Sequence, residues 1–179
     1  MKINYKNALN LRKAINDPKR LILLLIAFGL IFLLNSFASY NTSFKAQVVR
    51  VVDGDTIEVL DKNKKNYRVR FFGIDAPELN QAFGKKSKEF LASLVSGKEV
   101  KIIKKDTDKY NRTLVVIELE GKNINKIMVE NGFAWAYSYY TEAYVAEQDL
   151  AKSKKLGLWA DKKPIEPYKW RKTHSFKEK

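Results

Sequence analysis

The stretch "VVRVVDGDTIEVL", residues Val48 to Leu60, decides the fold. Two runs of β-branched residues are separated by Asp53-Gly54, and Asp-Gly is a strong signal for a hairpin turn. The sequence therefore predicts two antiparallel strands joined at this point. We interpret Asp53 as a turn residue that bonds its own backbone. Asp55 begins the second run, where an aspartate is unfavourable unless it has a partner, so it is a candidate functional residue.

Three further strand patterns follow this hairpin. "KNYRVRFFGI" alternates apolar and basic residues, and "KEVKIIKK" and "RTLVVIELEG" are rich in β-branched residues. Helices are predicted over "QAFGKKSKEFLASLVSG", "NINKIMVENGFA" and "TEAYVAEQDLAKSKKLG", the last with Ala143, Ala146 and Leu150 at helical spacing. Five strands with a helix after the third and helices after the fifth suit a Greek-key barrel of the oligonucleotide-binding type. Other α+β folds fit the pattern as well.

Composition limits the chemistry that the chain can perform. The 179 residues contain no cysteine, which excludes disulfides, thiolate nucleophiles and cysteine zinc sites. His174 is the single histidine and lies near the C-terminus, which argues against a Ser-His-Asp triad or a histidine metal site. If the protein is an enzyme, carboxylates must do the acid–base or metal work. The formal net charge of +14 suggests an anionic partner, or else only a soluble basic surface.

The N-terminal segment resembles a membrane-targeting region. Residues 1–20 form a basic leader with six Lys or Arg and one acid, and residues 21–39 carry no charge. About 20 apolar residues are needed to span a bilayer, so 21–39 is a transmembrane anchor or a signal peptide, and we favour the anchor. The leader would stay in the cytoplasm and the domain would lie outside, or be secreted after cleavage. A linker at 40–45, a domain at 46–160 and a basic tail at 161–179 complete the predicted organisation.

A second group of acids follows the third strand. In "RVRFFGIDAPEL", Asp75 ends an apolar strand and Glu78 comes three residues later, past the rigid Pro77. Asp55 and Asp75 each lie at the end of a strand, which allows them to meet at one rim of a barrel. Crowded carboxylates repel each other unless a cation lies among them, and oxygen ligands indicate Ca²⁺ or Mg²⁺. The alternative is that Asp75 and Glu78 have no functional role and lie at the N-terminus of a helix, where negative charges interact favourably with the helix dipole.

A third polar stretch, "DTDKYNRTLVV", invites comparison with a calcium-binding EF-hand loop. The comparison fails because Tyr110 occupies the third ligand position, Asn111 replaces the turn glycine and Ile117 occupies the twelfth position. The stretch is therefore predicted to be a turn that precedes a strand and contains Lys109, Tyr110 and Arg112.

These three stretches together resemble a known family. "VVDGDTIEV", "RVRFFGIDAPE" and "DKYNRTL" are similar to the three signature segments of the staphylococcal nuclease (thermonuclease) family, in its order and with its spacing. The resemblance extends from about Ala46 to Lys172. It implies an α+β fold, a five-stranded oligonucleotide-binding barrel with three helices, here preceded by an N-terminal hydrophobic helix. It also implies hydrolysis of DNA and RNA with Ca²⁺ as the cofactor.

The resemblance assigns a metal site residue by residue. Asp55 and Asp75 match the Ca²⁺ carboxylates. Ala76 matches the position whose backbone carbonyl completes the site, where the family often has threonine. Ser138 stands where the family has a substrate-contacting tyrosine, so this base-stacking role stays unassigned among the neighbouring tyrosines.

The resemblance also implies catalytic and substrate-binding residues. Glu78 resembles the carboxylate that activates or orients the attacking water. Arg70 and Arg112 resemble the two arginines that bind the reacting phosphate. Lys109 and Tyr110 match positions near a bound terminal phosphate.

The sequence thus predicts a calcium-dependent nuclease, anchored in the membrane or exported. A monomer without an obligate protein partner is expected. The first alternative is a barrel that binds nucleic acid without cutting it. The second is a membrane-bound adaptor that binds anionic lipid or wall polymer, although this role does not account for the two acid clusters.

Overall fold

The computed structural model describes residues 18–40, 43–139 and 141–174, with the side chains of 35–40 left out. The chain divides into two compact units, Met1–Thr42 and Ser43–Lys179, each of which is described by itself. Most of the predicted leader and part of the predicted linker therefore lie outside the described residues, as do residues 175–179 of the predicted tail.

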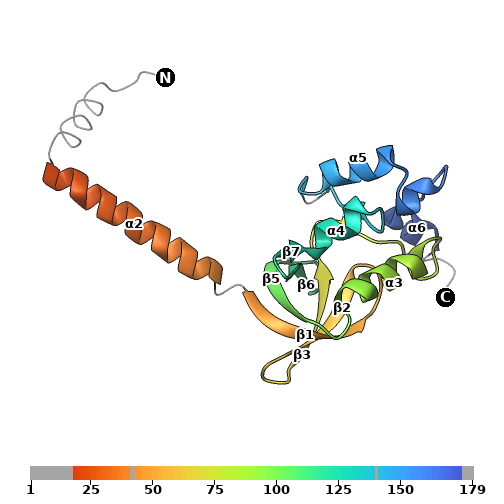
Figure 1. Cartoon of the computed structure of the whole chain (residues 1–179), viewed down its shortest axis with the longest axis horizontal. Coiled ribbons are helices and arrows are strands. Elements are labelled where there is room, and N and C mark those ends of the chain that lie inside the picture. Colours follow the sequence, from red (N-terminus) through yellow and green to blue (C-terminus); the bar gives the residue numbers. More distant parts are fainter. Residues whose placement is uncertain (1–17, 41–42, 140, 175–179) are drawn as a thin grey trace, which may run out of the picture. The chain divides into compact units, whose positions relative to one another are not determined.

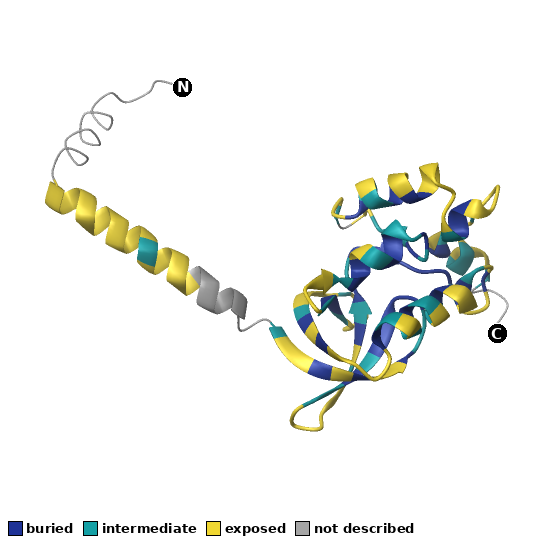
Figure 2. Ribbon diagram, in the orientation of Figure 1, coloured by how far each residue is buried: buried dark blue, intermediate teal, exposed yellow. Residues whose placement is uncertain are grey.

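Helix α2, Pro18–Tyr40, forms the described part of the first unit (Figure 1). Its large apolar side chains between Leu21 and Leu34 are exposed (Figure 2). Among the described residues, no helix has both the length and the apolar character needed to cross a membrane. The predicted span at 21–39 extends beyond the part of α2 whose side chains are described.

A closed barrel forms the centre of the second unit within the described residues. Its five long strands are β1 (Ser43–Val51), β2 (Thr56–Asp61), β3 (Asn66–Phe71), β5 (Glu99–Thr107) and β6 (Thr113–Leu119). They follow the order β3-β2-β1-β5-β6, and a parallel pairing of β3 with β6 closes the barrel. This order confirms the predicted Greek-key barrel of the oligonucleotide-binding type.

Three two-residue strands complete the sheets. Strand β7 (Lys122–Asn123) pairs with β6 beside the barrel. Strands β4 (Ile74–Asp75) and β8 (Trp135–Ala136) pair with each other in a separate small sheet. This second pairing fixes the backbone of the segment that carries the second acid cluster.

The hairpin that opens the fold has the predicted turn. The Asp53 carboxylate accepts a hydrogen bond from the backbone N–H of Asp55 at 3.0 Å, which confirms the turn role of Asp53. A glycine is needed at position 54 because a Cβ there would lie 2.7 Å from the Cβ of Ala76. The hairpin tip therefore packs directly against the side chains of Ala76 and Ser87, and a residue with a Cβ would not fit there.

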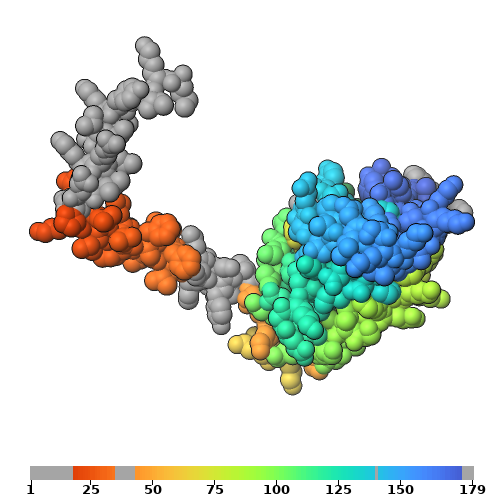
Figure 3. Space-filling model, turned by 45° about the horizontal axis from the view of Figure 1, so that its top comes forward, coloured from red at the N-terminus to blue at the C-terminus, as the bar shows by residue number. Residues whose placement is uncertain are grey.

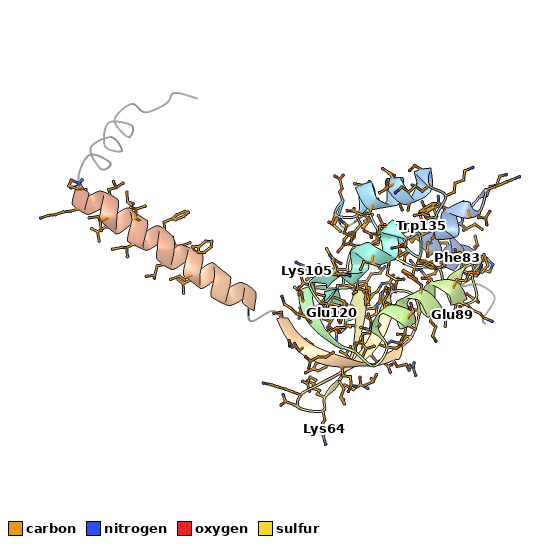
Figure 4. The ribbon with its side chains drawn as sticks, viewed as in Figure 1. Lys64, Phe83, Glu89, Lys105, Glu120 and Trp135 are labelled. Carbon is orange, nitrogen blue, oxygen red and sulfur yellow. The ribbon has the colours of Figure 1, made fainter. Side chains whose placement is uncertain are left out.

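Helices cover the barrel and build a second small core. They are α3 (Gly84–Val95), α4 (Ile124–Glu130), α5 (Val145–Ser153), the 3₁₀ helix η1 (Gly157–Ala160) and α6 (Pro167–His174). Leu91 and Val95 of α3 are fully buried against the barrel. The second core contains Leu158 and Trp159, with Phe83 and Trp135 packed against it (Figure 4).

Helix α5 is present, but the three residues noted at helical spacing do not form its buried face. Ala143, Ala146 and Leu150 are all exposed, and Ala151 is the helix residue that enters the second core. The buried residues of α5 are Gln148 and Ala151, three residues apart, so the buried face keeps helical spacing but lies on another side of the helix.

The C-terminal segment is more than a basic tail. Helix α6 lies within the predicted tail at 161–179, and the compact unit continues past the predicted domain end at residue 160. The indole N–H of Trp170 donates to the Asn80 side chain at 3.2 Å, and the Gln81 side chain donates to the carbonyl of Ile165 at 2.7 Å. In Figure 3 the blue C-terminal part of the chain packs against the green part of the same unit.

Candidate active site

A single guanidinium joins the two predicted metal carboxylates. Asp55 lies at the hairpin tip, Asp75 on β4 and Arg70 near the end of β3. Arg70 Nη1 lies 2.5 Å from Asp55 Oδ1, and Arg70 Nη2 lies 2.6 Å from Asp75 Oδ1. The aspartate side chains are only 2% and 3% exposed. The structure therefore brings the two acid clusters together at one rim of the barrel.

Each aspartate keeps one acceptor position open. A carboxylate oxygen has two lone pairs. Asp55 Oδ1 accepts from Arg70 and from the Thr56 hydroxyl at 3.0 Å, whereas Asp55 Oδ2 accepts only from the Ala76 N–H at 2.8 Å among the described residues. In the described part of the chain, Asp75 Oδ1 accepts from Arg70 and Arg171, and Asp75 Oδ2 accepts from Arg171 alone. One lone pair thus remains on Oδ2 of each aspartate.

A second guanidinium, unforeseen from the sequence, reaches the same cluster from α6. Arg171 Nη1 donates to Asp75 Oδ1 at 3.0 Å and to Glu78 Oε1 at 2.8 Å, and Arg171 Nη2 donates to Asp75 Oδ2 at 2.9 Å. Arg171 therefore bridges a predicted metal ligand and the predicted water-orienting carboxylate. The sequence offered no local signal for this contact, because Arg171 is one of 34 Lys and Arg residues and lies far along the chain.

Burial and pairing set the electrostatics of this cluster. Burial raises the pKa of Asp55 to about 6 and also raises the pKa of Asp75, although Arg70 and Arg171 counteract it. Burial alone would lower the pKa of Arg70, but the charges of Asp55 and Asp75 raise it, so the guanidinium stays charged. Counting Glu78, three carboxylates face two guanidinium groups, and the cluster carries one excess negative charge.

This donor set fits a hard divalent cation. The remaining acceptor positions are carboxylate oxygens, and the excess charge is negative, which together suit Ca²⁺ better than a soft metal. No group of three or more Asp, Glu, His or Cys residues able to hold a metal occurs in the described ranges. A cation would therefore depend on two aspartates, supplemented by water and by the predicted Ala76 carbonyl.

The loop that carries Glu78 is tightly folded. The Gln81 side chain accepts from the Glu78 N–H at 3.1 Å, and the Gln81 N–H donates to the Glu78 carbonyl at 2.8 Å. Gly84, the first residue of α3, lies against the same carbonyl. A Cβ added at Gly84 would come within 1.8 Å of the Glu78 oxygen, which no side-chain motion can relieve. The position of Glu78 therefore depends on a glycine six residues later.

A Gly84→Ala variant is expected to be less stable by about 1–3 kcal/mol, because the added methyl group displaces the Glu78 loop. Urea unfolding monitored by tryptophan fluorescence measures this loss. Lys85→Ala is the matched control, since Lys85 is exposed in the same turn of α3. If Gly84→Ala and Lys85→Ala unfold at the same urea concentration, the loop tolerates displacement and Glu78 is not held as described.

In the structure the guanidinium of Arg112 is bound to Asp108. Arg112 Nε donates to Asp108 Oδ2 at 2.7 Å, while Asp108 Oδ1 accepts from the backbone N–H groups of Tyr110 and Arg112. Among the described residues, Arg112 makes no contact with Asp55 or Asp75. Arg112 is 46% exposed, whereas its partner Asp108 is 9% exposed; without Arg112, Asp108 would still accept from the backbone N–H groups of Tyr110 and Arg112.

The turn between β5 and β6 presents a basic and aromatic surface. The ring of Tyr110, which is 68% exposed, lies 5.0 Å from Lys109 Nζ and 5.2 Å from the Arg112 guanidinium carbon. Lys172 and, more weakly, Lys109 lower the pKa of Tyr168 on helix α6. Tyr139 is also exposed, whereas Tyr140 lies outside the described residues.

Comparison with known proteins shows the family of this chain. The model of the staphylococcal nuclease homologue family matches residues 68–161, more than half of the chain. An uncharacterized endonuclease of Haemophilus influenzae is 45% identical over 84% of this chain and 85% of its own length. Micrococcal nuclease of Shigella flexneri is 44% identical over 72% of this chain and 81% of its own. The chain therefore belongs to the staphylococcal nuclease family.

Proposed function

We propose that this chain is a calcium-dependent nuclease that hydrolyses the phosphodiester bonds of DNA and RNA. The observation that carries the proposal is the pair of buried aspartates joined by Arg70, each with one oxygen still able to bind a cation. Relatives named endonuclease and micrococcal nuclease support phosphodiester hydrolysis. The choice of Ca²⁺ and of both nucleic acids follows the family resemblance and the oxygen-only donor set.

Asp55 and Asp75 would hold the cation, with the Ala76 carbonyl as a further ligand. A bound divalent ion neutralises phosphate charge and polarises a phosphoryl oxygen. With such an ion in place, the cluster would carry one net positive charge instead of one negative charge. That charge matches the single negative charge of a phosphodiester.

Arg70 and Arg112 would bind the reacting phosphate from two sides. Arg70 uses two of its N–H donors on the aspartates, and a guanidinium has five in total, so donors remain for a phosphate oxygen. Arg112 would exchange Asp108 for the phosphate, since guanidinium binds both anions with similar geometry. Glu78 would accept a hydrogen bond from the attacking water and orient it.

The β5–β6 turn would bind the substrate strand beside the reacting phosphate. Lys109 supplies a positive charge to the backbone, which makes affinity depend on salt. The exposed ring of Tyr110 offers a surface on which an unpaired base can stack. Single-stranded segments would therefore bind better than duplex.

Calcium removal tests the proposal directly. The purified full chain is expected to cut single-stranded DNA and RNA at millimolar Ca²⁺, to lose activity when a chelator is added and to regain it when excess Ca²⁺ is restored. Gel electrophoresis of labelled oligonucleotides measures the products. An intact substrate at every Ca²⁺ concentration, combined with a mobility shift that shows binding, would support the non-catalytic binding module instead.

A further inference from the structure

We propose that Arg171 is a further active-site residue, a positioning residue that holds Asp75 and Glu78 in their working geometry from helix α6. This inference rests on the proposed function. It assigns a catalytic requirement to the C-terminal helix, which neither the sequence motifs nor the family resemblance connects with the site.

The contacts of Arg171 single it out among the basic residues of α6. Its guanidinium forms a two-bond fork with Asp75, and one nitrogen of the fork also binds Glu78. Asp75 is 3% exposed in its side chain, whereas Arg171 is 38% exposed, so the guanidinium closes the outer side of a buried carboxylate. By contrast, the ammonium group of Lys169 on the same helix pairs, within the described ranges, only with Glu166 three residues earlier on the surface.

Two further hydrogen bonds connect helix α6 and the residues just before it to the Glu78 loop. Trp170, the neighbour of Arg171, donates to Asn80, and the backbone before α6 accepts from Gln81. Gln81 in turn accepts from the N–H of Glu78. Pro167 at the start of the helix is buried. The loop and the helix therefore form one unit, in which Arg171 fixes the side chain of Glu78 while Gln81 fixes its backbone.

Arg171 and a bound cation need not compete for Asp75. The fork from Arg171 takes one lone pair on each oxygen of Asp75, and Arg70 takes the second lone pair of Oδ1. The second lone pair of Oδ2 remains for a metal ion. Arg171 thus leaves this one position of Asp75 open, and Arg70 would still orient Asp75 in its absence.

The charge of Arg171 separates its role from that of a structural contact. Without it the cluster would gain one negative charge, which favours a divalent cation but repels the phosphodiester. Loss of Arg171 should therefore leave cation affinity equal or higher while turnover falls. A residue needed only for folding would lower cation affinity, turnover and thermal stability together.

The experiment compares Arg171→Gln, Arg171→Lys and the control Lys169→Gln in the full-length protein. Isothermal titration calorimetry measures Ca²⁺ binding, oligonucleotide cleavage gives kcat and KM, and thermal unfolding reports the fold. Arg171→Gln is expected to bind Ca²⁺ at least as tightly as the wild type, while kcat falls roughly 10–100-fold because Glu78 is no longer positioned. Arg171→Lys should recover part of kcat, and Lys169→Gln should match the wild type.

Two results would overturn the inference. One is an Arg171→Gln kcat within about twofold of that of Lys169→Gln, which would make α6 a surface helix without a role in the site. The other is a parallel loss of Ca²⁺ affinity, kcat and thermal stability in Arg171→Gln, which would make the contact structural. If the wild type itself binds Ca²⁺ but cuts nothing, the proposed function fails, and this outcome is separate from both.

Discussion

An Arg70→Gln variant is expected to lose stability and turnover together. Arg70 lies between Asp55 and Asp75, whose side chains are almost fully buried. Removing one partner of a buried ion pair leaves an uncompensated charge and typically costs about 3–5 kcal/mol. The same guanidinium is proposed to bind the phosphate, and removing one such donor typically lowers the rate about 10²–10³-fold. The expected phenotype is therefore a weakly folded, nearly inactive protein.

Calcium should restore part of the stability but not the activity of this variant. A divalent cation between the two aspartates supplies the missing positive charge, whereas it cannot supply planar donors to the phosphate. Urea unfolding with and without Ca²⁺ measures the first effect, and oligonucleotide cleavage measures the second. Arg68→Gln is the matched control, because Arg68 is an exposed arginine two residues earlier on β3. If Arg70→Gln unfolds like Arg68→Gln, the aspartates do not depend on Arg70.

Local sequence patterns predicted the barrel because turn residues and the alternation of apolar and polar residues indicate where each strand begins and ends. The Asp53-Gly54 turn fixes the first hairpin, and the alternation in "KNYRVRFFGI" places Val69 and Phe71 in the core. The same logic placed Asp55 and Asp75 at strand ends, and the structure shows them around Arg70. The proposed roles of these residues, and the side of a membrane on which they act, stay predictions.

Contacts between distant segments could not be predicted in this way. Arg171 binds Asp75 across 96 positions of sequence, and nothing near Arg171 indicates an acidic partner. Arg112, in contrast, binds a partner that is close in sequence. Asp108 lies four residues before it in a tight turn and binds its guanidinium in the structure. The family resemblance predicts that Arg112 binds phosphate, but it does not reveal this local competitor. Both outcomes depend on which anion is nearest in space, which a one-dimensional pattern does not specify.

A Glu78→Gln variant is expected to separate chemistry from folding. The Glu78 side chain is 35% exposed and makes one ion pair, with the partly exposed Arg171, so its loss should cost less than about 1 kcal/mol. The backbone bonds between Glu78 and Gln81 do not involve the carboxylate and should persist. The loss of a general base, however, typically lowers turnover about 10²–10⁴-fold.

Glu89→Gln provides the comparison, because Glu89 is an exposed glutamate on α3 (Figure 4). Both variants should unfold at the urea concentration of the wild type, and both should bind Ca²⁺, since Asp55 and Asp75 are untouched. Only Glu78→Gln should fail to cut oligonucleotides at saturating Ca²⁺. Equal cleavage by the two variants would mean that another group orients the water, and the arginine fork from α6 would then hold Glu78 for a purpose other than catalysis.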